Sequence, residues 1–292
     1  MKKIDMINYD LKKDIEFIIS AEQKNIDEIS EVTGISRTTI YEIFKYNKTT
    51  SKVYEKFYSL IYNLGYRLNS VKEDFLKETY KLVLFHGSKY GIDQLSCGGS
   101  RNNCDFGKGF YLGESYTQAL SFVCENNQSC VYSFVCDIST LEVLEFSCSL
   151  EWMIAICYYR GTIKEYENSN IVKQVIEKIN NADVIIAPIA DNRMFYIMSL
   201  FASGEINADV ALHSLSASKL GKQYIFKTEK SMNCIKPIDK YYLCKEEKKD
   251  CIQTLTIRAL EIETKLKMAK REFKNGLFIE ELLVWEILIW MG

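Results

Sequence analysis

The chain has 292 residues, of which 47% are apolar, and its 37 Lys+Arg residues nearly balance its 39 Asp+Glu residues. This composition excludes a disordered chain, because the apolar content is high and the formal net charge is only −2. A chain of this length predicts about two domains.

The N-terminal segment MKKIDMINYDLKKD has no apolar stretch before charged residues resume, so we expect no secretory signal. The longest apolar run, LFIEELLVWEILIWM, is interrupted by glutamates and is shorter than the ~20 residues that span a bilayer. We therefore expect a cytoplasmic protein with no membrane partner. The 10 Cys form no CxxC pair and there are only 2 His, so no metal site is predicted.

Residues 1–70 carry apolar side chains three and four positions apart, which predicts a small all-α domain. In NIDEISEVTGISRTTIYEIF a helix ends at Gly34, and Ser36 can cap the helix that follows. This layout predicts a helix-turn-helix. Four residues of the second helix would be exposed and suit base edges and phosphates, namely Arg37, Thr38, Thr39 and Tyr41.

The helix-turn-helix resembles the small Xre/Cro-like repressor domains, and this resemblance implies binding to a DNA operator. Residues 1–70 contain 11 basic and 10 acidic residues, so we expect weak DNA binding per monomer. Contact with a protein partner alone, such as an antitoxin, stays open as an alternative use of this domain.

From about residue 80 to 245 the pattern changes to that of an α+β domain. Short runs rich in Val, Ile, Phe and Tyr predict strands over 81–88, 109–112, 131–138, 141–146, 182–190 and 222–229. Amphipathic stretches between them predict helices over 115–126, 149–160, 171–181 and 192–201. A C-terminal extension, 246–292, is expected to hold a charged helix over 252–275, stopped by Gly276, and a last helix over 277–291.

Two common phosphate-binding loops are excluded by the glycine spacing. No GxxxxGK[ST] occurs, and GKGFYLG misses the GxGxxG spacing by one residue. Nucleoside-triphosphatase and Rossmann functions are therefore not expected.

Four segments occur in a characteristic order: FHGS at 85–88, NCDFGKGFYLGESYTQALSFV at 103–123, DNRMFYIMSLF at 191–201 and LGKQYIFKTEKS at 220–231. Together they resemble a bacterial family of ADP-ribosyltransferase-like domains in the H-Y-E branch, which includes diphtheria-toxin-like and PARP-like enzymes. The resemblance spans residues 80–245. It implies a split-β-sheet fold that binds NAD in a cleft between two sheets, and transfer of ADP-ribose to an acceptor by a toxin or phage-defence effector.

The same resemblance assigns roles within the site. His86 would hydrogen-bond a ribose of NAD, the backbone of Gly87 would hold the nicotinamide amide, and Ser88 lies beside it. Tyr111 would stack on the nicotinamide ring. The third position of the branch is usually glutamate, and here it is Gln223, which can bind a ribose hydroxyl but cannot act as a general base. We therefore expect mono-ADP-ribosylation, with His86, Tyr111 and Gln223 as catalytic residues.

Further residues are candidates for the cofactor site. Arg101, Lys108 and Arg193 could bind the pyrophosphate, because guanidinium groups match phosphate oxygens. Gly109, in the glycine-flanked loop FGKGFY, is assigned to the same site. Asp105 could orient this loop or the acceptor.

Three carboxylates, Asp105, Asp191 and Glu229, are candidates if a base is needed. Glu229 would share a strand face with Gln223, at a separation of roughly 20 Å. The second histidine, His213, is expected to lie on a helix with a structural role. The acceptor stays open between nucleic acid and protein, and a non-catalytic NAD sensor that tunes a repressor is the alternative function.

Overall fold

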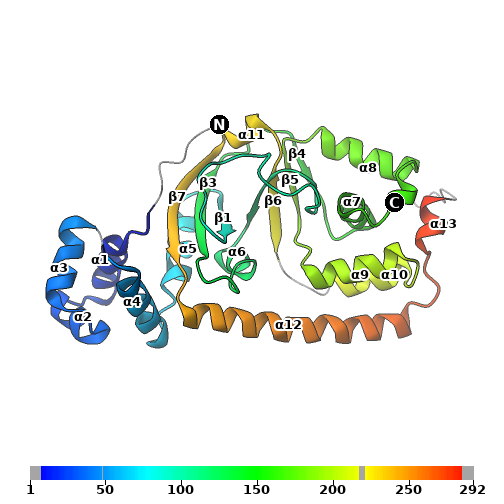
Figure 1. Cartoon of the computed structure of the whole chain (residues 1–292). Helices are drawn as coiled ribbons and strands as arrows, with labels where there is room; N and C mark the ends of the chain where they lie inside the picture. The colour runs from blue at the N-terminus through cyan, green and yellow to red at the C-terminus, as the bar shows by residue number, and fades with distance from the viewer. Residues whose placement is uncertain (1–7, 48, 217–220, 285–292) are drawn as a thin grey trace.

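The computed structural model describes residues 8–47, 49–216 and 221–284 (Figure 1). Its N-terminal part is helical, with α1 at Leu11–Glu22, α2 at Ile26–Thr33, α3 at Arg37–Tyr46 and α4 at Ser51–Asn63. The predicted turn is present, because Gly34 ends α2 with a φ of 59° and the Ser36 side chain accepts from the backbone N–H of Thr39 at the start of α3. The buried residues that hold these helices together include Ile29, Ile35, Ile40 and Ile43.

The expected boundary between the two parts is occupied by a helix, α5, at Leu68–Thr79. Leu68 packs into the core of α1–α4, whereas Leu76 packs into the core beneath the first strands of the sheet. Cys244, from the far end of the chain, also lies in the core of α1–α4. The N-terminal helices therefore share their core with the rest of the molecule.

A seven-stranded, mostly antiparallel sheet forms the centre of the described chain, in the order β4-β5-β6-β2-β1-β3-β7. Only β4 and β5 run parallel. The strands are β1 at Val83–Ser88, β2 at Phe110–Gly113, β3 at Cys130–Cys136, β4 at Val143–Glu145, β5 at Val184–Pro188, β6 at Lys222–Phe226 and β7 at Ile235–Tyr242. We expected two sheets, and the structure joins all seven strands in one; β1 and β2, however, pair at a single position, Phe85 with Gly113.

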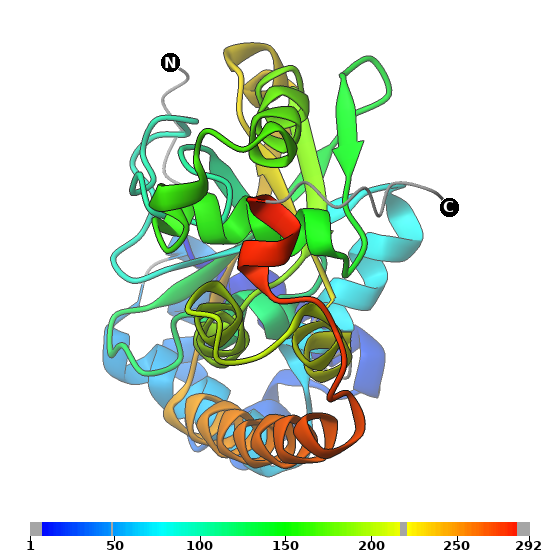
Figure 2. The ribbon, with the colours of Figure 1, turned by 90° about the vertical axis from the view of Figure 1, so that its right-hand side faces the viewer.

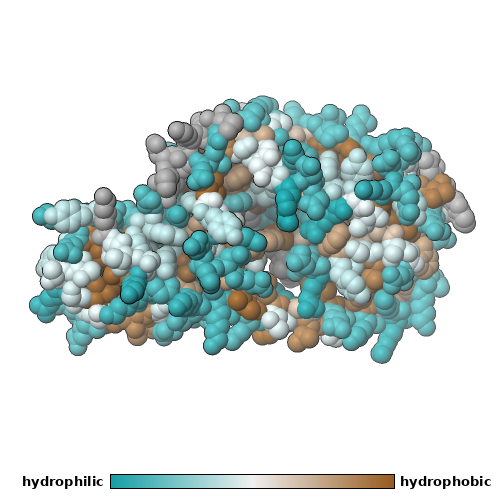
Figure 3. All heavy atoms as spheres, viewed as in Figure 1, coloured by the Kyte–Doolittle hydropathy of each residue, from teal (hydrophilic) through white to brown (hydrophobic). Residues whose placement is uncertain are grey.

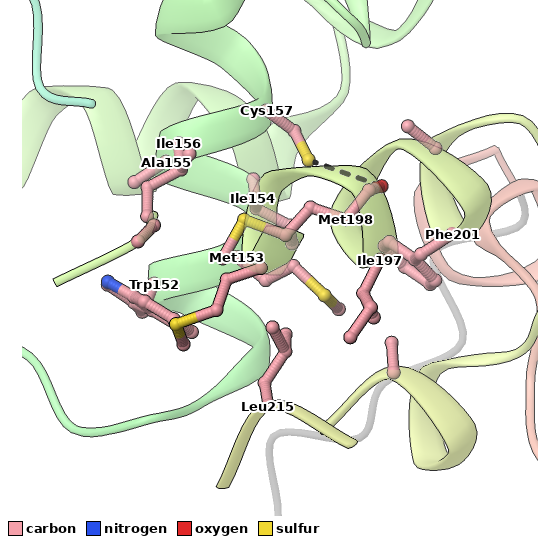
Figure 4. Close-up of a cluster of buried hydrophobic side chains, with 14 of the residues drawn as sticks. Trp152, Met153, Ile154, Ala155, Ile156, Cys157, Ile197, Met198, Phe201 and Leu215 are labelled. Carbon is pink, nitrogen blue, oxygen red and sulfur yellow. Dashed lines mark hydrogen bonds between the residues drawn. The ribbon is translucent and has the colours of Figure 1, made fainter. Parts of the chain in front are cut away.

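Strand alternation divides the core between the two faces of β5 and β6. Ile185 and Ile225 face a cluster built from α7 at Leu150–Arg160, α9 at Asn192–Ala202 and α10 at Ala208–Ser216, with Trp152 fully buried within it (Figure 4). Helix α8 at Asn170–Asn180 packs on α7, after a short 3₁₀ turn at Lys164–Tyr166. Val184 and Phe226 face the opposite cluster. Helix α6, at Tyr116–Ser121, packs on β1.

The C-terminal part consists of a long helix, α12 at Lys245–Glu272, and a short one, α13 at Ile279–Leu283. Figure 1 shows α12 running beneath the sheet from the N-terminal helices to α9 and α10, and Figure 2 shows α9 and α10 above it. On the face drawn in Figure 3 the surface is mostly hydrophilic, and apolar atoms show in separate spots, some of them along the edge where α12 lies. No helix among the described residues is long and apolar enough to cross a membrane.

Several predicted elements need correction. Strand β6 ends at Phe226, and helix α11 begins at Glu229 and ends at Met232, so a strand over 222–229 was wrong. Strand β7 was not predicted, because Pro237 and the charged residues around it obscure its alternation; the proline is tolerated on an edge strand, next to a register shift. Helix α12 begins at Lys245 and not at 252, and α13 covers only part of 277–291, whose residues 285–291 lie outside the described chain.

Candidate functional site

The His86 ring contacts the backbone of Tyr111 where β1 and β2 separate, whereas the Tyr111 ring packs against the cluster on the opposite face of β2 from Phe110. The Nδ1 atom of His86 lies 2.7 Å from the carbonyl oxygen of Tyr111, and its ring stacks on Phe110 with centroids 5.0 Å apart. Because a carbonyl only accepts, Nδ1 carries the hydrogen and Nε2 is left as an acceptor. Burial lowers the pKa of His86, so the ring is neutral at pH 7. The site therefore presents a neutral imidazole acceptor.

The Tyr111 side chain is closed over by the loop that precedes it. Its hydroxyl donates to the carbonyl of Gly107 at 2.7 Å and accepts from the backbone N–H of Phe106 at 3.1 Å. Burial raises the pKa of Tyr111, so the phenol keeps its proton. These bonds fix the orientation of the ring next to the loop 104–109.

Gln223 enters the same region from β6, which pairs with β2 so that Gln223 lies opposite Gly113. Its Nε2 donates to Oδ2 of Asp105 at 3.0 Å and to the carbonyl of Pro188 at 3.1 Å. Both Gln223 and Asp105 are only 7% exposed. Three adjacent strands of the sheet, β1, β2 and β6, therefore carry the three predicted catalytic residues.

Arg160 completes this group and was not predicted from the sequence. It is the last residue of α7, and its Nε donates to Oδ1 of Asp105 at 2.8 Å. Its guanidinium also lies over the Phe195 ring, 4.3 Å from the centroid. The signal that could have found it is a lone arginine at the end of a mostly apolar helix, immediately before Gly161.

Gly87 and Gly109 are explained by close packing. A β-carbon on Gly87 would lie 2.2 Å from the carbonyl oxygen of Ala119 on α6, and one on Gly109 would lie 2.5 Å from a methyl carbon of Ile225. We attributed the glycine at 87 to the approach of a ligand, and the structure assigns it to the approach of α6.

The remaining predicted contacts are more dispersed. The Ser88 hydroxyl donates to the carbonyl of Gly91 at 2.7 Å, and Arg101 is exposed on the loop between β1 and β2. Arg193 donates to the carbonyl of Ala259 on α12 at 3.0 Å, which gives this guanidinium a structural contact. Lys108 is exposed.

The other two candidate carboxylates lie in helix-terminal positions. Asp191 caps α9, accepting from the backbone N–H groups of Arg193 at 3.0 Å and Met194 at 2.8 Å. Glu229 is the first residue of α11, so the strand face that we expected it to share with Gln223 does not exist. His213 lies on α10 as expected, with its ring 4.8 Å from that of Phe273.

No group of three or more potential metal ligands occurs among the residues that the structure describes. Two surface hollows lie elsewhere: one of about 260 Å³ between α7 and α8, lined in part by Val172 and Ile176, and one of about 580 Å³ among the N-terminal helices, lined in part by Ile19, Tyr41 and Phe44. Neither includes a residue of the His86–Tyr111–Gln223 group.

The protein is α+β, and the three predicted catalytic residues lie on adjacent strands of one sheet. Residues 82–236 match the family described as "Protein of unknown function (DUF3990)", and these residues make up more than half of the chain. The protein therefore belongs to this family. Comparison with curated proteins and with solved structures found no match.

Proposed function

We propose that this protein is an NAD-dependent mono-ADP-ribosyltransferase. The observation that carries the proposal is the contact of Nδ1 of His86 with the backbone carbonyl oxygen of Tyr111, 2.7 Å away, at the junction where β1 and β2 pair at a single position. Gln223 lies on the next strand, β6, opposite Gly113. Such a junction suits a ligand that inserts between two halves of a sheet, as the resemblance to ADP-ribosyltransferases implies.

Each of the three residues has chemistry suited to NAD. The Nε2 atom of His86 can accept a hydrogen bond from a ribose hydroxyl, and the Tyr111 ring offers an aromatic face to the nicotinamide. Gln223 can accept from the second ribose. When the bond between C1′ and the nicotinamide nitrogen breaks, nicotinamide leaves with the electron pair, and the acceptor forms the new bond to C1′ and releases its proton. Because the ribosyl centre is loose and positively charged, orientation can supply much of the rate without a carboxylate base.

We infer that the acceptor is a macromolecule, and nucleic acid is favoured slightly by the basic side chains of α12, which include Arg258, Lys267 and Lys270. Modification of an essential nucleic acid or protein would make the chain a toxin or a phage-defence effector. Transfer is expected to stop at one ADP-ribose.

The test uses the full chain, NAD labelled on the adenylate phosphate, and a cell lysate that is digested afterwards with nuclease or protease. We expect nicotinamide release and transfer of label to material that one of the two digestions removes. Tyr111→Ala should lower the rate at least about 100-fold, whereas Tyr46→Ala, at a position 59% exposed on α3, should not.

If the wild-type chain neither releases nicotinamide nor transfers label, the proposed enzymatic function is wrong. If Tyr111→Ala does not fold, Tyr111→Leu serves instead, because it fills more of the same space and still removes the aromatic face assigned to nicotinamide.

A second function is favoured by Gln223, since a site without a carboxylate at this position also suits a sensor that binds NAD without cleaving it. Calorimetry distinguishes the two functions. Stable NAD binding without nicotinamide release, accompanied by a change in DNA affinity, would support the sensor.

For the N-terminal helices we propose contact with DNA through α3. Arg37 and Tyr41 are 63% and 58% exposed and Thr38 is exposed, although Arg37 pairs with Asp27 at 2.8 Å and the Thr39 hydroxyl is engaged with Ser36. A mobility shift on the gene's own promoter that weakens steeply with salt is expected. A salt-independent shift, or none, would favour contact with a protein partner, such as an antitoxin.

A further inference from the structure

We infer that Asp105 is a positioning residue, which holds the side-chain amide of Gln223 so that its carbonyl oxygen Oε1 is the atom offered to a ribose hydroxyl. The inference rests on the proposed function. It adds the residue that lets glutamine serve at a position where glutamate is usual.

The orientation of the Gln223 amide follows from its two neighbours. The Nε2 atom lies 3.0 Å from Oδ2 of Asp105 and 3.1 Å from the carbonyl oxygen of Pro188, and both of these oxygens are acceptors. If the amide turned over, Oε1 would face two acceptors and both hydrogen bonds would be lost. Both hydrogens of the NH₂ group are therefore used inside the protein. Within the described chain Oε1 accepts no hydrogen bond, so it remains to accept one from a ligand.

Asp105 can hold the amide because a second group holds Asp105. Its other oxygen, Oδ1, accepts from Nε of Arg160 at 2.8 Å, and Arg160 is in turn placed by the Phe195 ring. A carboxylate that is 7% exposed needs such a partner, because burial of an unpaired charge is costly. The carboxylate thus divides its oxygens between Arg160 and Gln223.

This arrangement also explains why a glutamate would fit poorly at position 223. A second carboxylate would place its oxygens 3.0 Å from those of Asp105 and 3.1 Å from the carbonyl of Pro188, where the amide now donates. The glutamine is therefore the residue that matches its surroundings.

The experiment measures nicotinamide release as a function of NAD concentration for Asp105→Asn, for Gln223→Glu and for the two changes combined. Each single variant should lower kcat about 10- to 100-fold and change KM much less, because a misdirected group acts mainly on the transition state. The double variant should recover most of the loss. In it the asparagine can donate to the introduced carboxylate while its oxygen still accepts from Arg160.

Matched controls make the same chemical changes at exposed positions. Asp137→Asn and Gln128→Glu should leave kcat and KM unchanged. Circular dichroism checks that each variant is folded.

The outcomes separate this inference from the proposed function. A wild-type chain that releases no nicotinamide overturns the function, and this role with it. An active wild type with an unimpaired Asp105→Asn variant overturns only the role of Asp105. If Asp105→Asn does not fold, the double variant decides: a folded double variant that retains most activity supports the role, and a folded but inactive one overturns it.

Discussion

The imidazole of His86 has its tautomer set by the backbone. Its Nδ1 atom must donate to the carbonyl of Tyr111, so Nε2 is an acceptor as long as the ring is neutral. Burial lowers the pKa of His86 below the ordinary 6.5. Protonation would turn Nε2 into a donor and would place a charge in a buried position.

We therefore predict that NAD affinity is constant at neutral pH and falls as the pH drops through the lowered pKa of His86. Because the unfolded chain takes up this proton first, stability associated with His86 is fully present above pH 6.5 and declines below it. Calorimetric titration with NAD between pH 8 and pH 5 measures the affinity.

The chain has only two histidines, which provides a matched control. His86→Gln should remove the decline in NAD affinity at low pH, and His213→Gln should retain it. A decline that persists unchanged in His86→Gln would contradict the assignment.

At the scale of elements, α12 packs against α4 and α6 near one end and against α9 and α10 near the other. Near its start, Glu247 is buried and accepts from Nδ2 of Asn69 on α5 at 3.0 Å and from the hydroxyl of Tyr116 on α6. Burial raises the pKa of Glu247 to about 7. The contact among these three helices therefore contains a carboxyl group that prefers to be neutral.

We predict that Glu247 makes stability depend on pH between about 4.5 and 7. Its folded-state pKa lies above the unfolded value of 4.5, so the folded protein binds the additional proton and stability falls as the pH rises to about 7. The change corresponds to about 3 kcal/mol. Urea unfolding of the wild type and of Glu247→Gln at pH 5 and pH 8 measures it as the difference between the two proteins, because His86 acts in the opposite direction below pH 6.5.

Glu247→Gln should reduce the difference in stability between pH 5 and pH 8. At pH 8 it should be more stable than the wild type. Glu261→Gln, on an exposed part of the same helix, serves as the control and should behave as the wild type. An equal pH dependence in Glu247→Gln and wild type would exclude Glu247 as its source.

At the scale of the whole molecule, a buried charge network joins the N-terminal helices to the sheet. Lys72 on α5 lies 2.8 Å from Asp14 on α1 and 3.0 Å from Asp239 on β7. Tyr58 on α4 donates to the same Asp14, and Tyr242 on β7 stacks on Tyr58. Since these contacts cross from one part of the chain to the other, we expect the described parts to unfold together.

We predict that Lys72→Met destabilises the protein by about 3–5 kcal/mol, because it removes the buried cation that pairs with two buried carboxylates. The control is Lys12→Met, which breaks a surface pair with Glu16 and should cost at most about 1 kcal/mol. Denaturant unfolding followed by tryptophan fluorescence and by near-ultraviolet tyrosine signals measures both. In the wild type the two signals should change together, and two separate transitions would contradict a single cooperative unit.

The parts of the fold that were predicted correctly are those whose signal lies in the spacing of residues close together in the sequence. The β1 residues lie within the run KLVLFHGS, and the turn between α2 and α3 follows from Gly34 and Ser36. Strand β7 was missed because its signal is not local: it is an edge strand that is stabilised by pairing with β3. Position 229 was misassigned because Thr228 caps a helix there.

The sequence by itself determined that this is an α+β protein with helices at both ends, and its resemblance to ADP-ribosyltransferase-like domains predicted His86, Tyr111 and Gln223 as site residues. Only the tertiary structure decided what those residues touch. Asp105 and Gln223 are 118 positions apart, and Arg160 comes to them from a third element. Spacing along a chain records which face of an element is apolar, whereas a polar contact between distant positions depends on the order of strands in the sheet, which no local pattern encodes.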